Sequence, residues 1–251
     1  MRLFDLKHKW AVITGASRGI GRSIALGLSE AGANIILCST NENLLQNVAQ
    51  EIQNKGGTAK VYVLDIRNSK MIDNFYQKID KDCINIDILV NNAGVIQREH
   101  AEKFNEEDWN KILDINLKGT FLMSQEAGIR MLKRGKGKII NIASILGFLG
   151  GKNVSSYVVS KGGICSMTKA LASEWGGVVN VNAIAPGYIE TDMTLPLKQD
   201  SLRYNEILGR IPAKRWGKVD DLKGAAIFLA SNASNYVNGH TLVVDGGYLI
   251  Y

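Results

Sequence analysis

Short apolar runs alternate with longer amphipathic segments along the chain, and this alternation constrains the fold more than any other feature. The runs predicted to be buried strands are 11–14, 34–38, 59–64, 87–90, 138–143, 179–184 and 241–244. The segments with helical spacing of apolar residues are 20–31, 42–55, 106–132, 157–175 and 220–230. Strands that alternate with helices predict βαβ units and a parallel sheet. Because the strand runs are apolar on both faces, we expect a doubly wound α/β fold, with helices covering both faces of a seven-stranded sheet.

The length and composition fit one domain that spans residues 1–251. Of the 251 residues, 45% are hydrophobic and 22% are charged, and α/β folds of this size are often single domains. The chain has only three prolines. No linker-like tract and no repeat of solenoid period interrupts it.

The net charge of +6 raises the question of an acidic partner. The densest basic cluster lies at the expected end of a helix and comprises Arg130, Lys133, Arg134, Lys136 and Lys138. Cations suit a helix C-terminus, where the helix dipole is negative, and no aromatic residue interleaves the cluster. We interpret the cluster as a solvated helix end and expect no nucleic-acid partner.

The cysteines and the first residues bear on metal content and location. Cys38, Cys83 and Cys165 are far apart, and no Cys or His lies at the spacing of a zinc site, so we expect free buried thiols and no metal. The first ten residues carry scattered charges, unlike a secretory signal. No apolar run approaches the length of a membrane span. The expected location is the cytoplasm, without membrane contact.

A glycine-rich loop, G-x3-G-x-G, links the first predicted strand to the first predicted helix. We expect Gly15 to permit a tight turn, Gly19 to let a pyrophosphate approach, and Gly21 to let the helix pack closely on the strand. A helix N-terminus offers free N–H groups and the positive end of its dipole to phosphates. Because the loop directly follows a strand, a dinucleotide site is favoured over a plain turn.

The end of the second predicted strand bears on the choice of dinucleotide. NAD-binding folds of this type usually carry an acidic residue there, which binds the ribose 2′-hydroxyl. Here residues 38–41 are Cys-Ser-Thr-Asn, and the first carboxylate is Glu42. Arg18 in the glycine loop either meets a 2′-phosphate or is a solvated loop residue. Together these features favour NADP over NAD.

Tyr157 and Lys161 stand four residues apart at the start of a predicted helix, a spacing that places both on one face. A free tyrosine has a pKa of about 10, and a nearby ammonium would lower that pKa by stabilising the phenolate. Such a pair can exchange a proton with a carbonyl or alcohol oxygen. Ser144 could hydrogen-bond the same oxygen, and Asn116 could orient Lys161 through water. Each residue alone also fits a structural role, so the case rests on their order with the glycine loop.

Six motifs, in this order and over the whole chain, resemble the short-chain dehydrogenase/reductase family. They are Thr14-Gly-x3-Gly-Ile-Gly21, Asn91-Asn92-Ala93-Gly94, Asn116, Ser144, Tyr157-x3-Lys161 and Pro186-Gly187. The resemblance implies a Rossmann-like fold and an NAD(P)-dependent oxidoreductase. It also implies four roles, namely an acid/base for Tyr157, a donor to the substrate oxygen for Ser144, a contact with the nicotinamide ribose for Lys161, and a place in a proton relay for Asn116.

The same resemblance implies cofactor contacts beyond the glycine loop. Residues 65–66 match the family's adenine contact, 92–94 the strand beside the cofactor, and 186–191 the loop on the nicotinamide side. The candidate cofactor residues are Gly15, Ser17, Arg18, Gly19, Ile20, Gly21, Ser39, Asp65, Ile66, Asn92, Ala93, Gly94, Tyr157, Lys161, Pro186, Gly187, Ile189 and Thr191.

Four further stretches, which begin at Asn91, Ile211, Tyr236 and Val244, resemble the gluconate-type sugar-acid dehydrogenases of the family. We therefore expect a sugar acid as the small-molecule substrate. Arginine binds a carboxylate best, because its planar fork can hold both oxygens. Arg98, just beyond the fourth predicted strand, is the candidate substrate ligand, with Arg215 as a second candidate. The alternative for Arg98 is an ion pair with Glu99 or Glu102 on a solvated surface.

Two other functions remain open. A 3-oxoacyl-carrier-protein-type reductase has a similar ending of the second strand and would use a basic docking surface, for which the cluster around Arg134 is the candidate. A nucleotide-sensing regulator would be expected to lose part of the Ser-Tyr-Lys set, which this chain keeps. Relatives usually form tetramers through the two long helices and the last strand. We accordingly expect a homotetramer, with the apolar tail 248–251 at or near a subunit contact.

Overall fold

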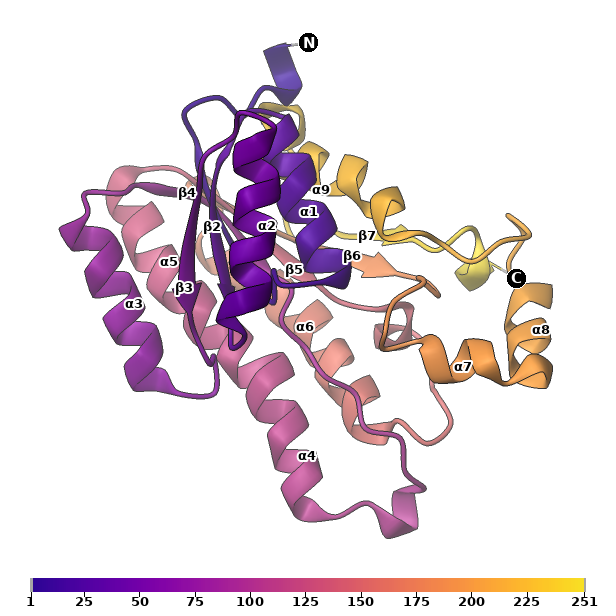
Figure 1. Ribbon diagram of the computed structural model, residues 1–251. Helices are drawn as coiled ribbons and strands as arrows, with labels where there is room; N and C mark the ends of the chain where they lie inside the picture. Colours follow the sequence, from indigo (N-terminus) through magenta and orange to yellow (C-terminus); the bar gives the residue numbers. More distant parts are fainter. Residues whose placement is uncertain (1, 251) are drawn as a thin grey trace.

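All seven predicted strands join one parallel sheet in the computed structural model, which describes residues 2–250 (Figure 1). The strand order is β3-β2-β1-β4-β5-β6-β7. The strands are β1 (Trp10–Thr14), β2 (Asn34–Ser39), β3 (Ala59–Val63), β4 (Ile86–Asn91), β5 (Gly137–Ile142), β6 (Val179–Pro186) and β7 (Thr241–Val244). The order reverses direction between β1 and β4, and ligands bind near such a point in doubly wound sheets. The predicted Rossmann-like fold class is confirmed.

Helices cover both faces of the sheet. One face packs against α1 (Gly19–Glu30), α2 (Glu42–Asn54) and α9 (Lys223–Ala230), and the other against α3 (Ser69–Lys81), α5 (Thr120–Arg134) and α6 (Ser155–Glu174). The side chains of a strand alternate between its faces. In β2, Ile35 and Leu37 therefore enter the first core, while Ile36 and Cys38 enter the second.

The segment predicted as one helix, 106–132, is divided into three parts. It begins with α4 (Glu106–Leu113), widens into a π-helical turn, η3 (Asp114–Gly119), and continues as α5 to Arg134. Gly135 then ends α5 in the left-handed conformation, with φ of +77°. Such π-helical turns are frequent at functional sites, and this one contains Asn116.

Three helices were not predicted, namely α3, α7 (Leu195–Gln199) and α8 (Ser201–Gly209). The segments after β4 and β6 extend beyond the sheet and carry α4, α7 and α8 (Figure 1). The remaining elements are single 3₁₀ turns, η1 (Arg2–Phe4), η2 (Ala101–Lys103), η4 (Ile145–Gly147), η5 (Val219–Leu222), η6 (Asn232–Ser234) and η7 (Tyr248–Ile250). None of the helices in the described part of the chain is both long and apolar enough to cross a membrane.

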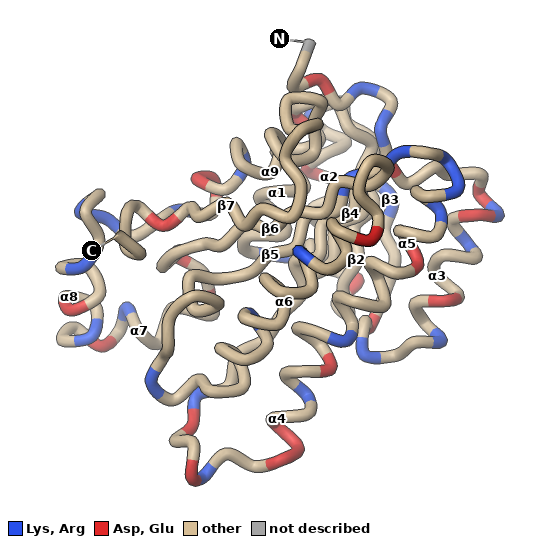
Figure 2. The backbone as a smooth tube through the Cα atoms, turned by 180° about the vertical axis from the view of Figure 1, so that it is seen from behind, with Lys and Arg blue, Asp and Glu red and all other residues tan. Residues whose placement is uncertain are grey.

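The basic cluster around α5 is only partly the solvated helix end that we expected, because Lys133 and Lys136 are exposed but the two arginines are paired. Arg130 pairs with Asp80 of α3 and Glu126, and Arg134 pairs with Asp87 and donates to the Ile86 carbonyl oxygen. Figure 2 shows Lys and Arg interspersed with Asp and Glu along α3, which packs beside α5. Of these acids, only Asp80 lies on a helix that was not predicted; Glu126 lies one turn before Arg130 on α5, and Asp87 lies in β4.

Lys138, the last member of the basic cluster, is buried. Its ammonium donates to Asn180 Oδ1 at 2.9 Å and to Asn235 Oδ1 at 3.0 Å. These partners lie far along the chain, so the sequence gives no sign of them. One expectation about the thiols was also wrong. Cys38 and Cys165 are buried, but Cys83 is exposed with φ of +54°, in the turn that follows α3.

Candidate functional site

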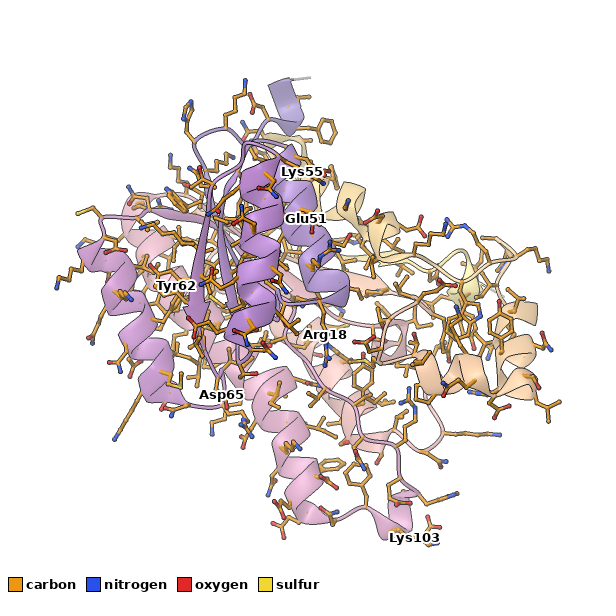
Figure 3. All side chains as sticks on the ribbon, in the orientation of Figure 1. Arg18, Glu51, Lys55, Tyr62, Asp65 and Lys103 are labelled. Carbon is orange, nitrogen blue, oxygen red and sulfur yellow. The ribbon has the colours of Figure 1, made fainter. Side chains whose placement is uncertain are left out.

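A cleft of about 640 Å³ lies where the strands end, and residues from the ends of β1 to β6 line it. This is the position at which doubly wound sheets bind ligands. Figure 3 shows Arg18 and Asp65 at this edge of the molecule. The cleft collects most of the predicted site residues: Gly15, Ser17, Arg18, Gly19, Ile20, Ser39, Asp65, Ile66, Asn92, Ala93, Gly94, Ser144, Tyr157, Lys161, Pro186, Gly187, Ile189 and Thr191. Gly21, Arg98 and Asn116 lie outside its lining.

Two glycines bring the loop before α1 into close contact with its surroundings. Gly15 has φ of +63°, and a Cβ there would lie 2.9 Å from the Cα of Ala93. A Cβ at Gly21 would lie 2.3 Å from the Gly15 carbonyl oxygen. The Asn92 side chain donates to the same oxygen at 3.1 Å. The loop is thus pressed against the segment after β4 and offers the α1 N-terminus to the cleft, a geometry that suits a pyrophosphate.

Thr14, the last residue of β1, holds the glycine loop to β4. Its Oγ1 accepts hydrogen bonds from the backbone N–H groups of Asn92 at 3.0 Å and Ala93 at 3.1 Å. The Thr14 carbonyl oxygen accepts from the Asn92 amide at 3.0 Å. These bonds fix two segments that line the cleft relative to each other.

Tyr157, Lys161 and Ser144 meet in the cleft, and each side chain is more than nine-tenths buried. Tyr157 and Lys161 lie one turn apart on α6, as the spacing predicted. Ser144 follows β5 and accepts a hydrogen bond from the Leu146 N–H at 3.1 Å. Lys161 Nζ donates to the Ile142 carbonyl oxygen at 2.6 Å, and burial lowers its pKa to about 8. The arrangement holds a phenol, a hydroxyl and an amine around one region of the cleft.

The environment of Tyr157 differs from our expectation. Burial raises the pKa of its phenol above the ordinary value, and this effect exceeds the lowering by hydrogen bonding to Ser144 and by the charge of Arg98. The lowering that we expected from Lys161 is wrong for the chain alone. The Lys161 ammonium donates to the Ile142 carbonyl oxygen, and its Nζ lies 5.6 Å from the centre of the Tyr157 ring.

Asn116 braces the segment after β4 against α6. Its Oδ1 accepts from the Val95 N–H at 2.8 Å, and its Nδ2 donates to the Val95 carbonyl oxygen at 2.9 Å and to Ser160 Oγ at 3.1 Å. Ser160 directly precedes Lys161 on α6. No direct hydrogen bond joins the Asn116 and Lys161 side chains in the described structure, so the proton relay stays a prediction.

Arg98 is half-buried beside the cleft and donates from Nη2 to the Met193 carbonyl oxygen at 3.1 Å. Within residues 2–250 it forms no ion pair with Glu99 or Glu102, so the surface alternative is wrong. Burial lowers the pKa of the guanidinium, and the nearby Tyr157 and Tyr188 oppose that effect. Arg98 therefore holds a positive charge near the phenol without a carboxylate to neutralise it.

Arg215, the second candidate substrate ligand, is engaged elsewhere. Its guanidinium donates to both carboxylate oxygens of Asp221, at 2.6 and 3.0 Å, and to the Trp216 carbonyl oxygen. Its side chain is 54% exposed. Arg98 is thus the better placed of the two arginines.

The cleft lining contains two basic residues that the sequence analysis missed, Arg67 and Lys111. Arg67 Nε donates to both carboxylate oxygens of Asp65 at 3.0 Å, which lowers the pKa of that carboxyl. The position of Arg67 two residues after Asp65 was a usable signal. Lys111 comes from α4, and no sequence signal linked it to the cleft. Ser39 also lines the cleft, and residues 38–40 bring no carboxylate to it.

The family profile described as "Enoyl-(Acyl carrier protein) reductase" matches residues 15–249. The chain belongs to the short-chain dehydrogenase/reductase family. It is accordingly an NAD(P)-dependent oxidoreductase, as the resemblance implied. In this family member, no group of three or more His, Cys, Asp or Glu side chains within residues 2–250 is arranged to hold a metal ion.

Three relatives show what this family member is similar to. The 2-dehydro-3-deoxy-D-gluconate 5-dehydrogenase of Bacillus subtilis is 49% identical, over 98% of this chain and 96% of its own. A crystal structure of a gluconate 5-dehydrogenase from Burkholderia cenocepacia, in complex with NADP and tartrate, has a TM-score of 0.97 at 39% identity, over 100% of this chain and 98% of its own. A putative 2-deoxy-D-gluconate 3-dehydrogenase from Agrobacterium tumefaciens with bound NADP has a TM-score of 0.93 at 42% identity, over 100% of both chains.

The comparisons confirm both resemblances, the one to the family and the finer one to gluconate-type dehydrogenases within it. The two solved relatives contain NADP, the cofactor that the ending of β2 favours.

Proposed function

We propose that this chain is an NADP(H)-dependent dehydrogenase that interconverts a secondary alcohol and a ketone on a gluconate-type sugar acid. One observation carries the proposal. The buried Tyr157 phenol lies in the cleft with Ser144, close to the charge of the unpaired Arg98. A proton-exchanging phenol and a carboxylate-binding cation beside it match the two functional groups of a sugar acid. The names of the relatives support the same substrate class.

The glycine loop and α1 N-terminus would hold the cofactor's pyrophosphate, and Asp65 would hold its adenine. The tight approach at Gly15 and Gly21 fits this role, because a side chain at either position would collide with the backbone. Lys161 would hold the nicotinamide ribose. When bound, the nicotinamide ring accepts a hydride from the alcohol carbon or supplies one to the carbonyl carbon. We propose NADP over NAD because the cleft receives no carboxylate from residues 38–40 and does receive Arg18.

Tyr157 moves the proton. On oxidation its phenolate oxygen takes the hydroxyl proton of the substrate, and on reduction its hydroxyl returns a proton to the carbonyl oxygen. The Ser144 hydroxyl donates a hydrogen bond to that same oxygen. Both groups are largely buried, so solvent screens their electrostatic interactions with the substrate less than it would at the surface. Asn116 acts as a positioning residue, because it ties the segment after β4 to Ser160 beside Lys161.

A panel assay tests the proposal. Gluconate-type sugar acids, their keto forms and a 3-oxoacyl thioester are each assayed with NADP(H) and NAD(H). We expect turnover of sugar acids and little of the thioester, because the arginines of the basic cluster on α5 are held in ion pairs rather than free for docking. Turnover of the thioester alone would indicate the acyl reductase instead. Cofactor binding without any turnover would indicate a nucleotide-sensing regulator.

Assembly and location complete the proposal. We propose that residues 1–251 form one dinucleotide-binding and catalytic domain, that the chain works as a homotetramer, and that it works in the cytoplasm. Apolar side chains exposed on the two long helices, Phe121, Ile129 and Val159, support subunit contacts there. In the tail, Tyr248 is buried and Ile250 is 89% exposed, which leaves Ile250 available to a neighbouring subunit. Residue 251, also part of the predicted contact, lies outside the described residues. A monomer in light scattering would contradict the tetramer.

A further inference from the structure

Arg18 and Asp192 face each other at the rim of the cofactor cleft. Arg18 belongs to the glycine loop (Figure 3), and Asp192 to the segment after β6. Both residues line the cleft, and 3.4 Å separates Arg18 Nη1 from Asp192 Oδ2. Their side chains are 71% and 75% exposed, so a ligand in the cleft can reach either group. The proposed chemistry makes no use of Asp192.

The segment that carries Asp192 is held in place by its own bonds. Thr194 Oγ1 donates to the Ile189 carbonyl oxygen at 2.7 Å and accepts from the Thr191 N–H at 3.0 Å. The carbonyl oxygen of Met193 is held by Arg98. Because bonds flank it on both sides, the backbone that carries Asp192 is held in place. Arg18 has the longer side chain, which extends from the loop before α1.

Asp192 and Asp65 are the two acids that line the cleft. Asp65 is neutralised by Arg67, which binds both of its oxygens. The carboxylate of Asp192 has Arg18 as its cation, and that arginine is the one that the glycine loop offers to a phosphate. A 2′-phosphate carries about −1.5 to −2 charges near neutral pH, whereas the 2′-hydroxyl of NAD carries none. Because the pyrophosphate is common to both dinucleotides, NADP draws Arg18 away from Asp192 more strongly than NAD does.

We propose that Asp192 is a specificity-determining residue, which competes with the 2′-phosphate of NADP for Arg18 and so weakens the preference for NADP over NAD. The inference rests on the proposed use of NADP. The selectivity for NADP over NAD then depends on two competing interactions of Arg18. One is with the 2′-phosphate of the ligand, and the other is with Asp192. Removing the carboxylate of Asp192 frees the guanidinium to bind the 2′-phosphate.

Direct binding tests this inference without turnover. The dissociation constants of NADPH and NADH are measured from the fluorescence of the reduced nicotinamide, in the absence of substrate. For Asp192→Asn we expect NADPH to bind roughly two- to fivefold more tightly relative to NADH, the size expected for an exposed ion pair and equal to about 0.4–1 kcal/mol. Glu190→Gln is the matched control. It removes the same charge from the same segment, but Glu190 pairs with Lys198 at 2.9 Å and does not line the cleft.

The double variant Arg18→Ala, Asp192→Asn separates competition for Arg18 from general charge repulsion. In the Arg18→Ala background, Asp192→Asn should no longer change the ratio of the two dissociation constants. The inference is overturned if Asp192→Asn leaves the ratio unchanged, if Glu190→Gln changes it equally, or if the effect persists without Arg18. Failure of the wild-type chain to bind NADPH would overturn the proposed cofactor together with this inference.

Discussion

Arg98 donates a hydrogen bond from Nη2 to the carbonyl oxygen of Met193, at 3.1 Å, and this bond joins the segment after β4 to the segment after β6. Residues of both segments line the cleft that contains Tyr157. One side of the guanidinium is thereby fixed, while its charge stays free of any carboxylate. A residue held in this way is well suited to bind one end of an anionic substrate while the other end reacts.

Arg98→Ala should weaken the binding of a sugar acid in the transition state by roughly 1.5–3 kcal/mol. This is the usual value of a hydrogen bond to a charged group. The corresponding uncharged keto-sugar should scarcely be affected, since it lacks the carboxylate. The measurement is kcat/KM for both substrates. Arg98→Lys serves as a graded control, because it keeps the charge but loses the planar fork. Equal losses on both substrates would rule out Arg98 as the carboxylate ligand.

The pH dependence of turnover should follow Tyr157. Oxidation needs the phenolate and reduction needs the phenol, and burial raises the pKa of this group. The rate of alcohol oxidation should therefore rise as the pH increases toward that raised pKa, and the rate of carbonyl reduction should fall above it.

Ser144 and Arg98 both lower the pKa of Tyr157. Ser144→Ala and Arg98→Ala should therefore move the alkaline limb of both profiles to higher pH. The profiles of kcat/KM are recorded with an uncharged substrate, so that loss of carboxylate binding does not interfere. An alkaline limb at the same pH in both variants would show that another group controls the rate.

Ser39→Asp should shift the cofactor preference toward NAD. The new carboxylate would stand at the end of β2, where it can accept a hydrogen bond from the ribose 2′-hydroxyl and repel a 2′-phosphate. The gain in NADH affinity should be roughly two- to tenfold, in line with one added hydrogen bond. Binding of both reduced cofactors is measured by fluorescence, with Ser39→Asn as the neutral control. Loss of affinity for both cofactors alike would contradict this account.

Lys138 should make stability depend on pH. Burial lowers the pKa of Lys138 from 10.5 to about 8, so between these values the unfolded chain binds more protons than the folded chain. The free energy of unfolding therefore increases as the pH rises from about 8 to 10.5. Below about pH 8, Lys138 is charged in the folded chain and the full cost of burying that charge is present. In Lys138→Met this contribution disappears.

Denaturant unfolding at several pH values between 7 and 10 measures the difference between wild type and variant. The free energy of unfolding of the wild type, relative to that of Lys138→Met, should increase from pH 8 upward. Lys136→Met is the matched control, because Lys136 is exposed and should give no such trend. A difference that stays constant over the whole range would show that Lys138 keeps an ordinary pKa when the chain is folded.

Much of the sheet could be predicted because each strand coincides with a short apolar run in the sequence. The apolar runs located all seven strands within about two residues of their ends, and β7 was placed at its bounds. In contrast, α3 was missed although Ile72, Phe75, Tyr76 and Ile79 follow helical spacing and are buried. The sequence of α3 therefore carries a usable helical signal. The short helices α7 and α8 contain a single fully buried residue, Ile207, and so offered no comparable pattern.

The residues of the site could be predicted more fully than their environment. The motifs brought Tyr157, Ser144 and Lys161 into one cleft. They did not indicate that the Ile142 carbonyl oxygen holds Lys161, or that Arg98 acts on the pKa of Tyr157. Both facts depend on backbone geometry and on the distance between strand ends, which no local pattern encodes. The pairing of Arg18 with Asp192 was hidden for the same reason.

The most direct test of the account is the turnover of Tyr157→Phe on a sugar acid that the wild type converts. This variant keeps the shape of the site and loses the exchangeable proton, so turnover should fall by roughly a hundred- to ten-thousandfold, while NADPH binding stays near the wild-type value. Tyr62→Phe is the matched control, since its hydroxyl bonds Asp82 and lies outside the cleft lining (Figure 3). Near-normal turnover in Tyr157→Phe would contradict the role of Tyr157 as the group that moves the proton.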